Sequence, residues 1–409
     1  MKWKFYSLAF VAGMSILTAC SSDDNNDNDG NGGNGNGNEN EHGTILKGTI
    51  TSDVTLAAGN TYKLSGEYIV EEGATLHIEE GVKIIAVYDD IADYILVKQG
   101  GKINAVGTPD KPIVMTSEKE EPGAWGGIHI CGRAHTNAEG GKGSSEIGGA
   151  VYGGNDDADN SGTLQYIRLE YTGFAFDEEH EANGISFYGV GNGTIVDHWQ
   201  AYKGSDDGFE FFGGSVNVSN LVAVSCSDDS FDWTEGWNGK GTNLVAYQED
   251  KSTLGYDCDC LMECDNNGKS FGATPVAHPI LANLTLIGNN AATPVAHPVL
   301  KNLILVGNGG SKQGIRLRAG TEVEIDNAKV CGKGQPLTVE TALTENALKN
   351  GTSKLTNITL TSELSSKEGI YTHADFIAVT SNKVDANLSY SSFEDIRKEC
   401  SWMNGSWVK

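Results

Sequence analysis

Short runs of alternating apolar and polar residues recur along most of the chain, each opened by an asparagine. The asparagines that open such runs are Asn220, Asn243, Asn283, Asn302, Asn327 and Asn357. A period of two residues is typical of β-strands, whereas a helical repeat would place apolar residues three or four positions apart. Strands about 20 residues apart leave little room for crossover helices, so successive coils must stack strand on strand. The pattern therefore predicts an all-β fold, a parallel β-helix built as a single-stranded solenoid.

One repeat is almost verbatim. The heptapeptide Ala-Thr-Pro-Val-Ala-His-Pro occupies residues 273–279 and again residues 292–298, and a similar apolar run follows each copy. In stacked coils, an inward-pointing asparagine can hydrogen-bond to its copies about 4.8 Å above and below. We therefore expect the asparagine column to be structural.

A second column carries more information about function. Six short segments flanked by glycine or serine align, and their second and fourth positions are apolar. Because side chains alternate across a strand, the third and fifth positions should face outward. The third position, here called the third-position column, holds His129, Ser186, Glu210, Asp232, Glu263 and Arg316. The fifth position holds Tyr188, Phe212, Thr234, Asp265 and Arg318.

Three carboxylates of the third-position column, Glu210, Asp232 and Glu263, fall on adjacent coils. Neighbouring coils place such groups about 5 Å apart and next-nearest coils about 10 Å apart. These separations bracket those of retaining (~5–5.5 Å) and inverting (~6.5–9.5 Å) glycosidases. Close like charges also raise at least one pKa, as a general acid requires. The three residues are therefore candidate catalytic groups of a polysaccharide hydrolase or lyase, with His129 and Arg316 as weaker candidates.

Two acidic pairs suggest a metal site. Ser-Asp-Asp-Gly-Phe-Glu begins at residue 205 and Ser-Asp-Asp-Ser-Phe-Asp at residue 227, one coil later. Asp206 and Asp207 should therefore stack near Asp228 and Asp229, and their oxygens suit calcium, the one cofactor we expect. The alternative is that these aspartates accept hydrogen bonds from turn amides, as aspartate commonly does.

The charge of the chain limits its partners. The 409 residues carry a formal net charge of −26. This acidity argues against nucleic acid as a partner and against electrostatic docking on anionic lipid. It permits a cationic ligand, and we expect a monomer.

A long rigid face with outward aromatic side chains suits an extended glycan, because aromatic planes cover sugar faces at low entropic cost. We therefore predict binding of an extracellular polysaccharide or host glycan. The expected ligand-binding residues are Ser186, Tyr188, Phe212, Thr234, Trp237, Asp265 and Arg318.

The N-terminus predicts export. Lys2 and Lys4 precede an apolar run over residues 5–19, the pattern of a secretory signal. The run ends Leu-Thr-Ala-Cys, which resembles a bacterial lipobox with Cys20 as the lipidated mature N-terminus. The acidic pair at residues 23–24 resembles a surface-export signal. We expect an outer-membrane lipoprotein that faces the cell surface and contacts the membrane through its lipid alone.

Several segments carry a family resemblance. Residues 123–130, 160–171, 206–214, 228–237 and 263–267 resemble a family of bacterial right-handed parallel β-helix surface lipoproteins, of the pectate-lyase-like superfold. The resemblance covers about residues 46–335, and its Asp-Asp segments are the most specific part. It implies a right-handed β-helix, while the activity of this family is not settled. The superfold includes pectate lyases and polygalacturonases, but fold alone does not confer function.

Composition and pattern together divide the chain into four parts. Residues 1–19 are the signal peptide, and residues 20–45 are a flexible tether of Asn, Gly and Asp. Residues 46–335 form the β-helix. Residues 336–409 hold the last coils, a helical insertion over residues 338–350 and a C-terminal helix over residues 392–400 that should cap the last coil. Three functions remain open: glycan binding, polysaccharide cleavage, and a structural or adhesive solenoid stabilised by calcium.

Overall fold

The computed structural model describes residues 45–89, 91–176, 180–259, 261–270, 272–288, 293–294, 299–307, 313–317, 323–390 and 392–409. The predicted signal, the lipidation site Cys20, the tether and Arg318 lie outside these residues, apart from Ile45 at the end of the tether. Within the described ranges, no helix has both the length and the hydropathy needed to span a membrane.

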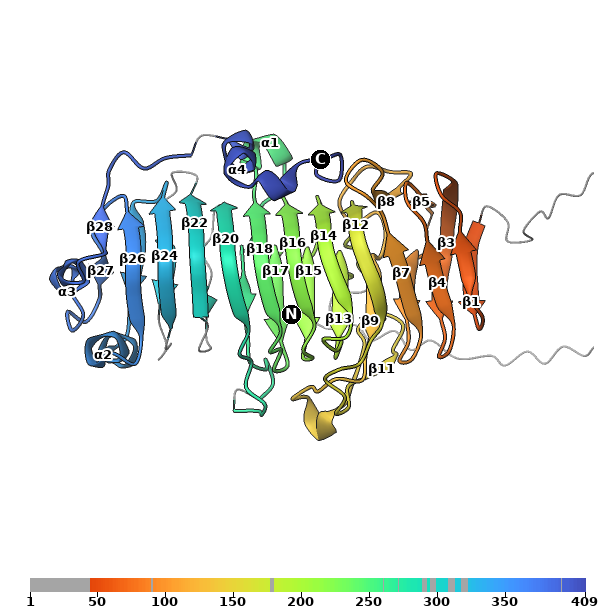
Figure 1. The fold of residues 1–409 in the computed structure, drawn as a ribbon, viewed down its shortest axis with the longest axis horizontal. Coiled ribbons are helices and arrows are strands. Elements are labelled where there is room, and N and C mark those ends of the chain that lie inside the picture. The colour runs from red at the N-terminus through yellow and green to blue at the C-terminus, as the bar shows by residue number, and fades with distance from the viewer. Residues whose placement is uncertain are drawn as a thin grey trace, which may run out of the picture. The chain divides into compact units, whose positions relative to one another are not determined.

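The described chain folds as the predicted right-handed parallel β-helix (Figure 1). Its most regular part is a long-strand stack, in which each strand pairs in parallel with the corresponding strand of the next coil. The stack consists of β12 (Gly162–Glu170), β14 (Ile195–Tyr202), β16 (Asn217–Val224), β18 (Lys240–Tyr247), β20 (Ile280–Gly288), β22 (Val299–Gly307), β24 (Glu324–Cys331) and β26 (Lys354–Leu360).

A second series of parallel strands, the short-strand stack, forms another face of the solenoid. It consists of β6 (Tyr94–Val97), β9 (Ile128–Cys131), β13 (Ile185–Tyr188), β15 (Phe209–Phe212), β17 (Phe231–Thr234), β19 (Glu263–Cys264) and β21 (Thr293–Pro294). The near-verbatim repeat is confirmed as one coil, because Ile280 of β20 pairs with Val299 of β22.

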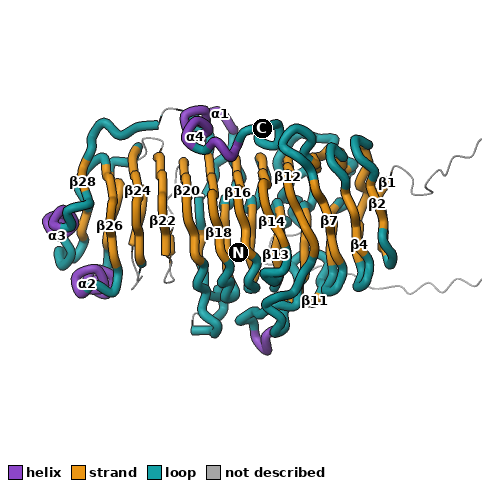
Figure 2. The backbone as a smooth tube through the Cα atoms, viewed as in Figure 1, coloured by secondary structure: helices purple, strands orange, loops and turns teal. Residues whose placement is uncertain are grey.

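Most of the remaining strands begin and end the solenoid (Figure 2). The first coils use β1 (Ile45–Ile50), β2 (Val54–Leu56), β3 (Thr61–Val70), β4 (Thr75–Ile78), β5 (Lys83–Ala86), β7 (Lys102–Val106) and β8 (Ile113–Ser117). The last coils use β23 (Gln313–Leu317), β25 (Gln335–Val339), β27 (Ser365–Ser366) and β28 (Lys383–Val384). Strands therefore continue well past residue 335.

The asparagine column forms, but it does not point inward. Its members have a left-handed backbone, with φ from 56° to 60°, which asparagine tolerates better than most residues. Strand pairing skips Asn220 and Asn243, so each makes a corner within its strand. Asn243 donates to Asn220 Oδ1 at 2.7 Å, and Asn283 donates to Asn243 Oδ1 at 2.7 Å. The ladder is structural, as predicted; Asn220 and Asn243 are partly buried, and the members from Asn283 onward are exposed.

The C-terminal helix α4 (Phe393–Glu399) forms as predicted but does not cap the last coil. Residues 392–409, here called the C-terminal strap, pack against the outer side of the long-strand stack, where the Phe393 and Tyr247 rings lie 5.0 Å apart. Trp407 is buried there, with its ring 5.2 Å from that of His198. Outward apolar side chains of β16 and β18, among them Val222, Val224 and Val245, are buried beneath the strap, and this burial stabilises its position.

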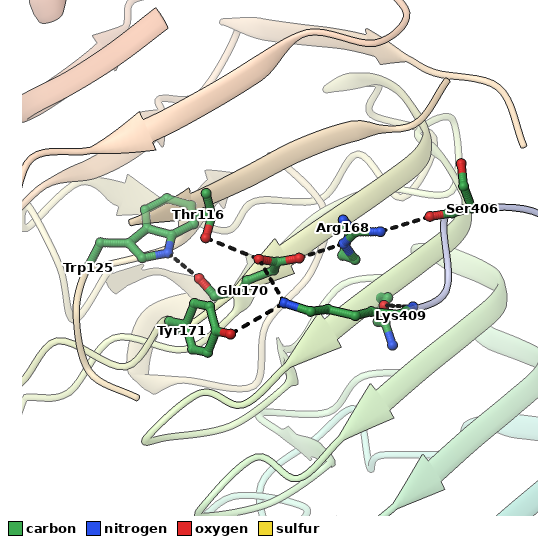
Figure 3. A network of polar contacts seen from close by, with 8 residues as sticks. Thr116, Trp125, Arg168, Glu170, Tyr171, Ser406 and Lys409 are labelled. Carbon is green, nitrogen blue, oxygen red and sulfur yellow. Dashed lines mark hydrogen bonds and ion pairs between the residues drawn. The ribbon is translucent and has the colours of Figure 1, made fainter. Parts of the chain in front are cut away.

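Polar contacts fix the end of the strap (Figure 3). Lys409 Nζ lies 3.4 Å from Glu170 Oε2 and 3.3 Å from the Tyr171 hydroxyl. Arg168 bonds to Glu170 at 2.7 Å and donates to the Ser406 carbonyl at 2.8 Å. The chain terminus is therefore held on β12, far along the solenoid from the last coil.

Two other helices close the C-terminal end of the core: α2 (Ala342–Asn350), within the predicted insertion, and α3 (His373–Ala378). Phe376 of α3 is fully buried in the main core. The carboxylate of Glu345 accepts hydrogen bonds from the Ser366 hydroxyl and from backbone amides between Lys367 and Tyr371. This carboxylate ties α2 to the loop that leads into α3.

Candidate functional site

The third-position column is confirmed as a register column through five strands. Direct pairings join His129 to Ser186, Ser186 to Glu210, Glu210 to Asp232 and Asp232 to Glu263. The next partner of Glu263 is Thr293, not Arg316. Arg316 lies on β23, pairs with Thr338 and bonds to Glu340 at 2.9 Å. Its predicted place beside the acidic residues is therefore wrong, because β21 was missed as a coil.

The prediction that Tyr188 and Phe212 are exposed is also wrong. Tyr188 is fully buried and Phe212 is 8% exposed, because Ile147, Ala150 and Tyr152 pack over them. The Tyr188 and Phe212 rings stack 4.4 Å apart. The covering loop carries the small hairpin of β10 (Gly143–Ser144) and β11 (Val151–Tyr152). These aromatic side chains form a second apolar layer outside the solenoid and do not offer a sugar-stacking surface.

Three other predicted site residues are buried as well. Ser186 has no exposed surface and accepts a hydrogen bond from the Asn183 side chain at 3.0 Å. His129 is also fully buried, and its Nε2 lies 2.7 Å from the Gly126 carbonyl. Burial lowers the pKa of His129 to about 4, so it is neutral near pH 7. Trp237 lies in the main core, 4.2 Å from the Phe211 ring, rather than on the surface.

Strands β15, β17 and β19, which carry Glu210, Asp232 and Glu263, also border a cleft of about 400 Å³. We call it the acidic cleft, because nine of its ten described lining residues are acidic and none is basic. They are Glu146, Glu181, Asn183, Asp206, Asp207, Glu210, Asp228, Asp229, Asp232 and Glu263. The cleft brings together the three predicted catalytic carboxylates and all four predicted metal ligands. Thr234 and Asp265 are partly exposed but do not line it.

Carboxylate oxygens in the cleft lie close enough to share a ligand. Asp207, Glu210 and Asp232 each offer an oxygen within 4.8 Å of the others, and Asp206, Asp207 and Asp228 do the same. Asp207 is the residue common to both groups. One oxygen of Asp207 accepts the backbone amide of Asp229 at 2.9 Å. This amide belongs to the turn of the next coil, so Asp207 does bind a turn amide, but it does so between coils and not within its own turn.

The pKa values of these groups are raised, first by burial and then by one another. Burial and the Asp228 charge raise the pKa of Asp206 to about 7 and that of Asp229 to about 9. Burial and the Glu263 charge raise the pKa of Asp232 to about 8. The pKa values of Asp207 and Glu210 are raised well above their usual range by burial and the neighbouring carboxylates. Near neutral pH the cleft therefore holds protons that exposed carboxylates would release.

Glu146, Glu181 and Asn183 were not identified from the sequence, because they lie in loops with no strand periodicity. Asn183 donates to both Ser186 and Glu210, so it fixes the Glu210 side chain. The sequence offered one signal for Asn183, because this residue directly precedes Gly184, the glycine used to align β13. Nothing in the local pattern distinguishes the two glutamates.

Loops from distant parts of the chain are joined by buried asparagines. The Asn137 side chain donates to Asn266 Oδ1 at 3.0 Å and to the Pro275 carbonyl at 2.9 Å. Asn267 donates back to Asn137 Oδ1 at 2.8 Å. All three asparagines are buried, so these bonds hold the two loops together.

Comparison with family models agrees with the fold. A family model described as a pectate-lyase-like beta helix domain matches residues 48–293 and 288–408. No curated protein matches the chain. Among solved structures, the Dettilon tailspike protein (gp208) is similar, with 10% sequence identity and a TM-score of 0.36. That match covers 80% of this chain and 61% of the tailspike chain.

Proposed function

The chain belongs to the family of pectate-lyase-like β-helix domains, and we propose that it binds an extended glycan across its acidic cleft. The observation that carries this proposal is the cleft itself, about 400 Å³ in volume and lined almost wholly by carboxyl groups. Carboxyl groups accept hydrogen bonds, and when protonated they also donate one, so they pair well with sugar hydroxyls. Ligand sites are usually concave with convergent polar groups, as this cleft is.

The charge of the cleft selects among glycans. Polymers that carry carboxylate or sulfate groups would find no basic side chain on the described lining to pair with, and they would be repelled by every cleft carboxyl that is ionised. Neutral polymers and polymers with amino sugars avoid this repulsion. We therefore propose a neutral or amino-sugar polysaccharide as the ligand, in place of the aromatic stacking expected from the sequence.

The binding test compares polysaccharides of each charge class on the full-length chain. The wild type should retain neutral or amino-sugar polymers and should not retain polygalacturonate or sulfated polymers. Asp207→Asn and Glu210→Gln should weaken retention at least tenfold, while the exposed Asp110→Asn serves as a matched control. Equal retention by all variants would overturn the assignment of the cleft.

Polysaccharide cleavage is a second candidate, favoured by the spacing of Asp207, Glu210 and Asp232. Their oxygens lie within 4.8 Å of one another, nearer to the ~5–5.5 Å of retaining glycosidases than to the wider inverting separation. In that chemistry one protonated carboxyl gives its proton to the leaving oxygen as a second carboxylate attacks the anomeric carbon and the glycosidic C–O bond breaks. Water, deprotonated by the first carboxylate, then hydrolyses the glycosyl–carboxylate bond and restores both groups. New reducing ends with retained anomeric configuration, lost in Asp232→Asn, would support cleavage. Binding without any product would leave capture as the function.

We further propose that the protein is presented at the cell surface as an outer-membrane lipoprotein anchored through Cys20. The N-terminal pattern described above supports this location. Metabolic labelling with a fatty-acid analogue should mark the wild type but not Cys20→Ser. Protease added to intact cells should degrade the wild type, and full protection would contradict outward presentation.

A further inference from the structure

We propose that residues 142–152 form a hinged lid, which covers an apolar groove beside the acidic cleft and opens without unfolding of the solenoid. The lid carries the hairpin of β10 and β11, and its Glu146 lines the cleft. Opening the lid withdraws Glu146 and uncovers the groove, so the position of the lid controls the size of the cleft. That consequence rests on the proposed function, whereas the hinge can be tested without any glycan.

The groove beneath the lid is a register column of three outward side chains. Cys131 pairs with Tyr188, and Tyr188 pairs with Phe212, on the adjacent strands β9, β13 and β15. Phe212 lies two residues after Glu210, so both side chains point to the same side of β15. The groove and the acidic cleft therefore share one face of the solenoid, and lifting the lid joins them.

The lid is attached through a narrow neck with a glycine pair at each end. Gly140 and Gly141 precede it, and Gly153 and Gly154 follow it. The first pair has left-handed backbones, with φ of 73° and 70°, and an added Cβ at either residue would meet no atom of a non-neighbouring residue within 4 Å. The two pairs lie side by side, since a Cβ on Gly153 would be 2.8 Å from the Gly141 carbonyl oxygen. Glycine has more backbone freedom than other residues, so the neck can act as one hinge.

Side-chain contacts hold the lid closed. The Tyr152 hydroxyl donates to Glu235 at 2.8 Å, and the Tyr188 hydroxyl donates to Glu146 at 3.2 Å. Ile147 and Tyr152 are buried against the groove, where the Tyr152 and Tyr188 rings lie 5.1 Å apart. Among the described strands, β10 and β11 pair only with each other, so lifting the lid breaks no strand pairing of the solenoid.

Like charges oppose this closed position. Burial raises the pKa values of Asp206 and Glu210, and the negative charge of Glu146 raises both further. His180 and Lys269 attract Glu146 and offset part of the repulsion. The closed lid therefore balances apolar burial against charge repulsion, which lowers the free energy needed to open it.

Thiol labelling of the folded full-length chain tests the lid, because Cys131 lies beneath it. Cys226, which is equally buried in the main core, is the internal control. Peptide mass spectrometry after iodoacetamide treatment should show Cys131 modified at least tenfold faster than Cys226, since local opening requires less free energy than unfolding. Tyr152→Phe removes the bond to Glu235 and should accelerate labelling of Cys131 at least threefold, with Cys226 unchanged. Tyr62→Phe, which removes a hydroxyl contact on β3, is the matched control and should change neither rate.

Two results would overturn the proposal. One is equal labelling of Cys131 and Cys226, which would mean that both thiols are reached only by unfolding. The other is a Tyr152→Phe variant in which Cys131 is labelled no faster than in the wild type. A lid that opens in a chain that retains no polysaccharide would count against the proposed function and not against the hinge.

Discussion

Replacement of Asp232 by asparagine should stabilise the chelator-treated protein at pH 8 and have little effect at pH 4. Asparagine keeps the shape of the side chain and removes its charge. Burial and Glu263 raise the pKa of Asp232 from its usual 3.8 to about 8. In the folded protein this carboxyl is therefore protonated over a pH range in which the unfolded chain has released the proton. Its contribution to stability falls as pH rises from about 4 to about 8.

The magnitude follows from the size of the shift. One pKa unit corresponds to about 1.4 kcal/mol, so a shift of about four units sets an upper bound of roughly 5 kcal/mol at pH 8. In the wild type, neighbouring carboxyls can ionise in place of Asp232, which makes the increase in unfolding free energy on substitution smaller than this bound. We therefore expect Asp232→Asn to increase the unfolding free energy by about 1–4 kcal/mol at pH 8. Because this is a difference between protonation states, the gain should vanish below pH 4.

Urea unfolding in the presence of chelator, at pH 4, 6 and 8, measures this effect. The transition midpoint of Asp232→Asn should exceed that of the wild type by an amount that grows with pH. Asp110→Asn, which removes an exposed carboxylate, should follow the wild type at every pH. A gain of equal size at pH 4 and pH 8, or a loss at pH 8, would refute the reasoning that charge repulsion in the cleft costs stability.

Three further predictions concern the parts of the fold that support the site. Trp407→Ala removes a fully buried ring from the strap and should cost about 3–5 kcal/mol, with faster proteolysis near the C-terminus; unchanged cleavage would contradict its role. Glu345→Gln leaves at least two amides, most of them partly buried, facing an NH₂ group and should cost about 1–3 kcal/mol at pH 7 by urea unfolding. Because those bonds lower the pKa of Glu345, the wild type loses this advantage as pH falls, and a deficit unchanged at pH 3 would contradict the mechanism. Asn283→Ala and Asn283→Gly both lose two ladder hydrogen bonds, but only alanine is strained by a backbone φ of 59°. The unfolding midpoint should therefore fall further for Asn283→Ala than for Asn283→Gly, and the reverse order would contradict the corner geometry.

The coil register was predictable because the solenoid repeats one local pattern. A period of two residues and the Asp-Asp repeat placed Glu210, Asp232 and Glu263 in one column, and the strand pairings confirm it. Arg316 was misplaced because β21 has only two residues and carries no glycine-flanked apolar pattern. An alignment based on this pattern cannot detect a coil that lacks the pattern.

The covering of the site was not predictable from periodicity. Strand alternation shows which side chains point away from the solenoid core, but not whether a loop covers them. Tyr188 and Phe212 point outward as expected, yet Tyr152 from a distant loop packs over them. Their size and hydrophobicity favour this second apolar layer over exposure, so outward aromatic residues beside a long loop are better interpreted as its docking surface.

The most direct measurement of cleft function is the affinity of the full-length chain for neutral and amino-sugar polysaccharides, compared with an Asp207→Asn/Glu210→Gln double variant. The wild type should bind at least one such polymer, and the double variant should bind it at least tenfold more weakly while remaining folded. Equal affinity of the two proteins for every bound polymer would contradict a role of the acidic cleft in glycan recognition.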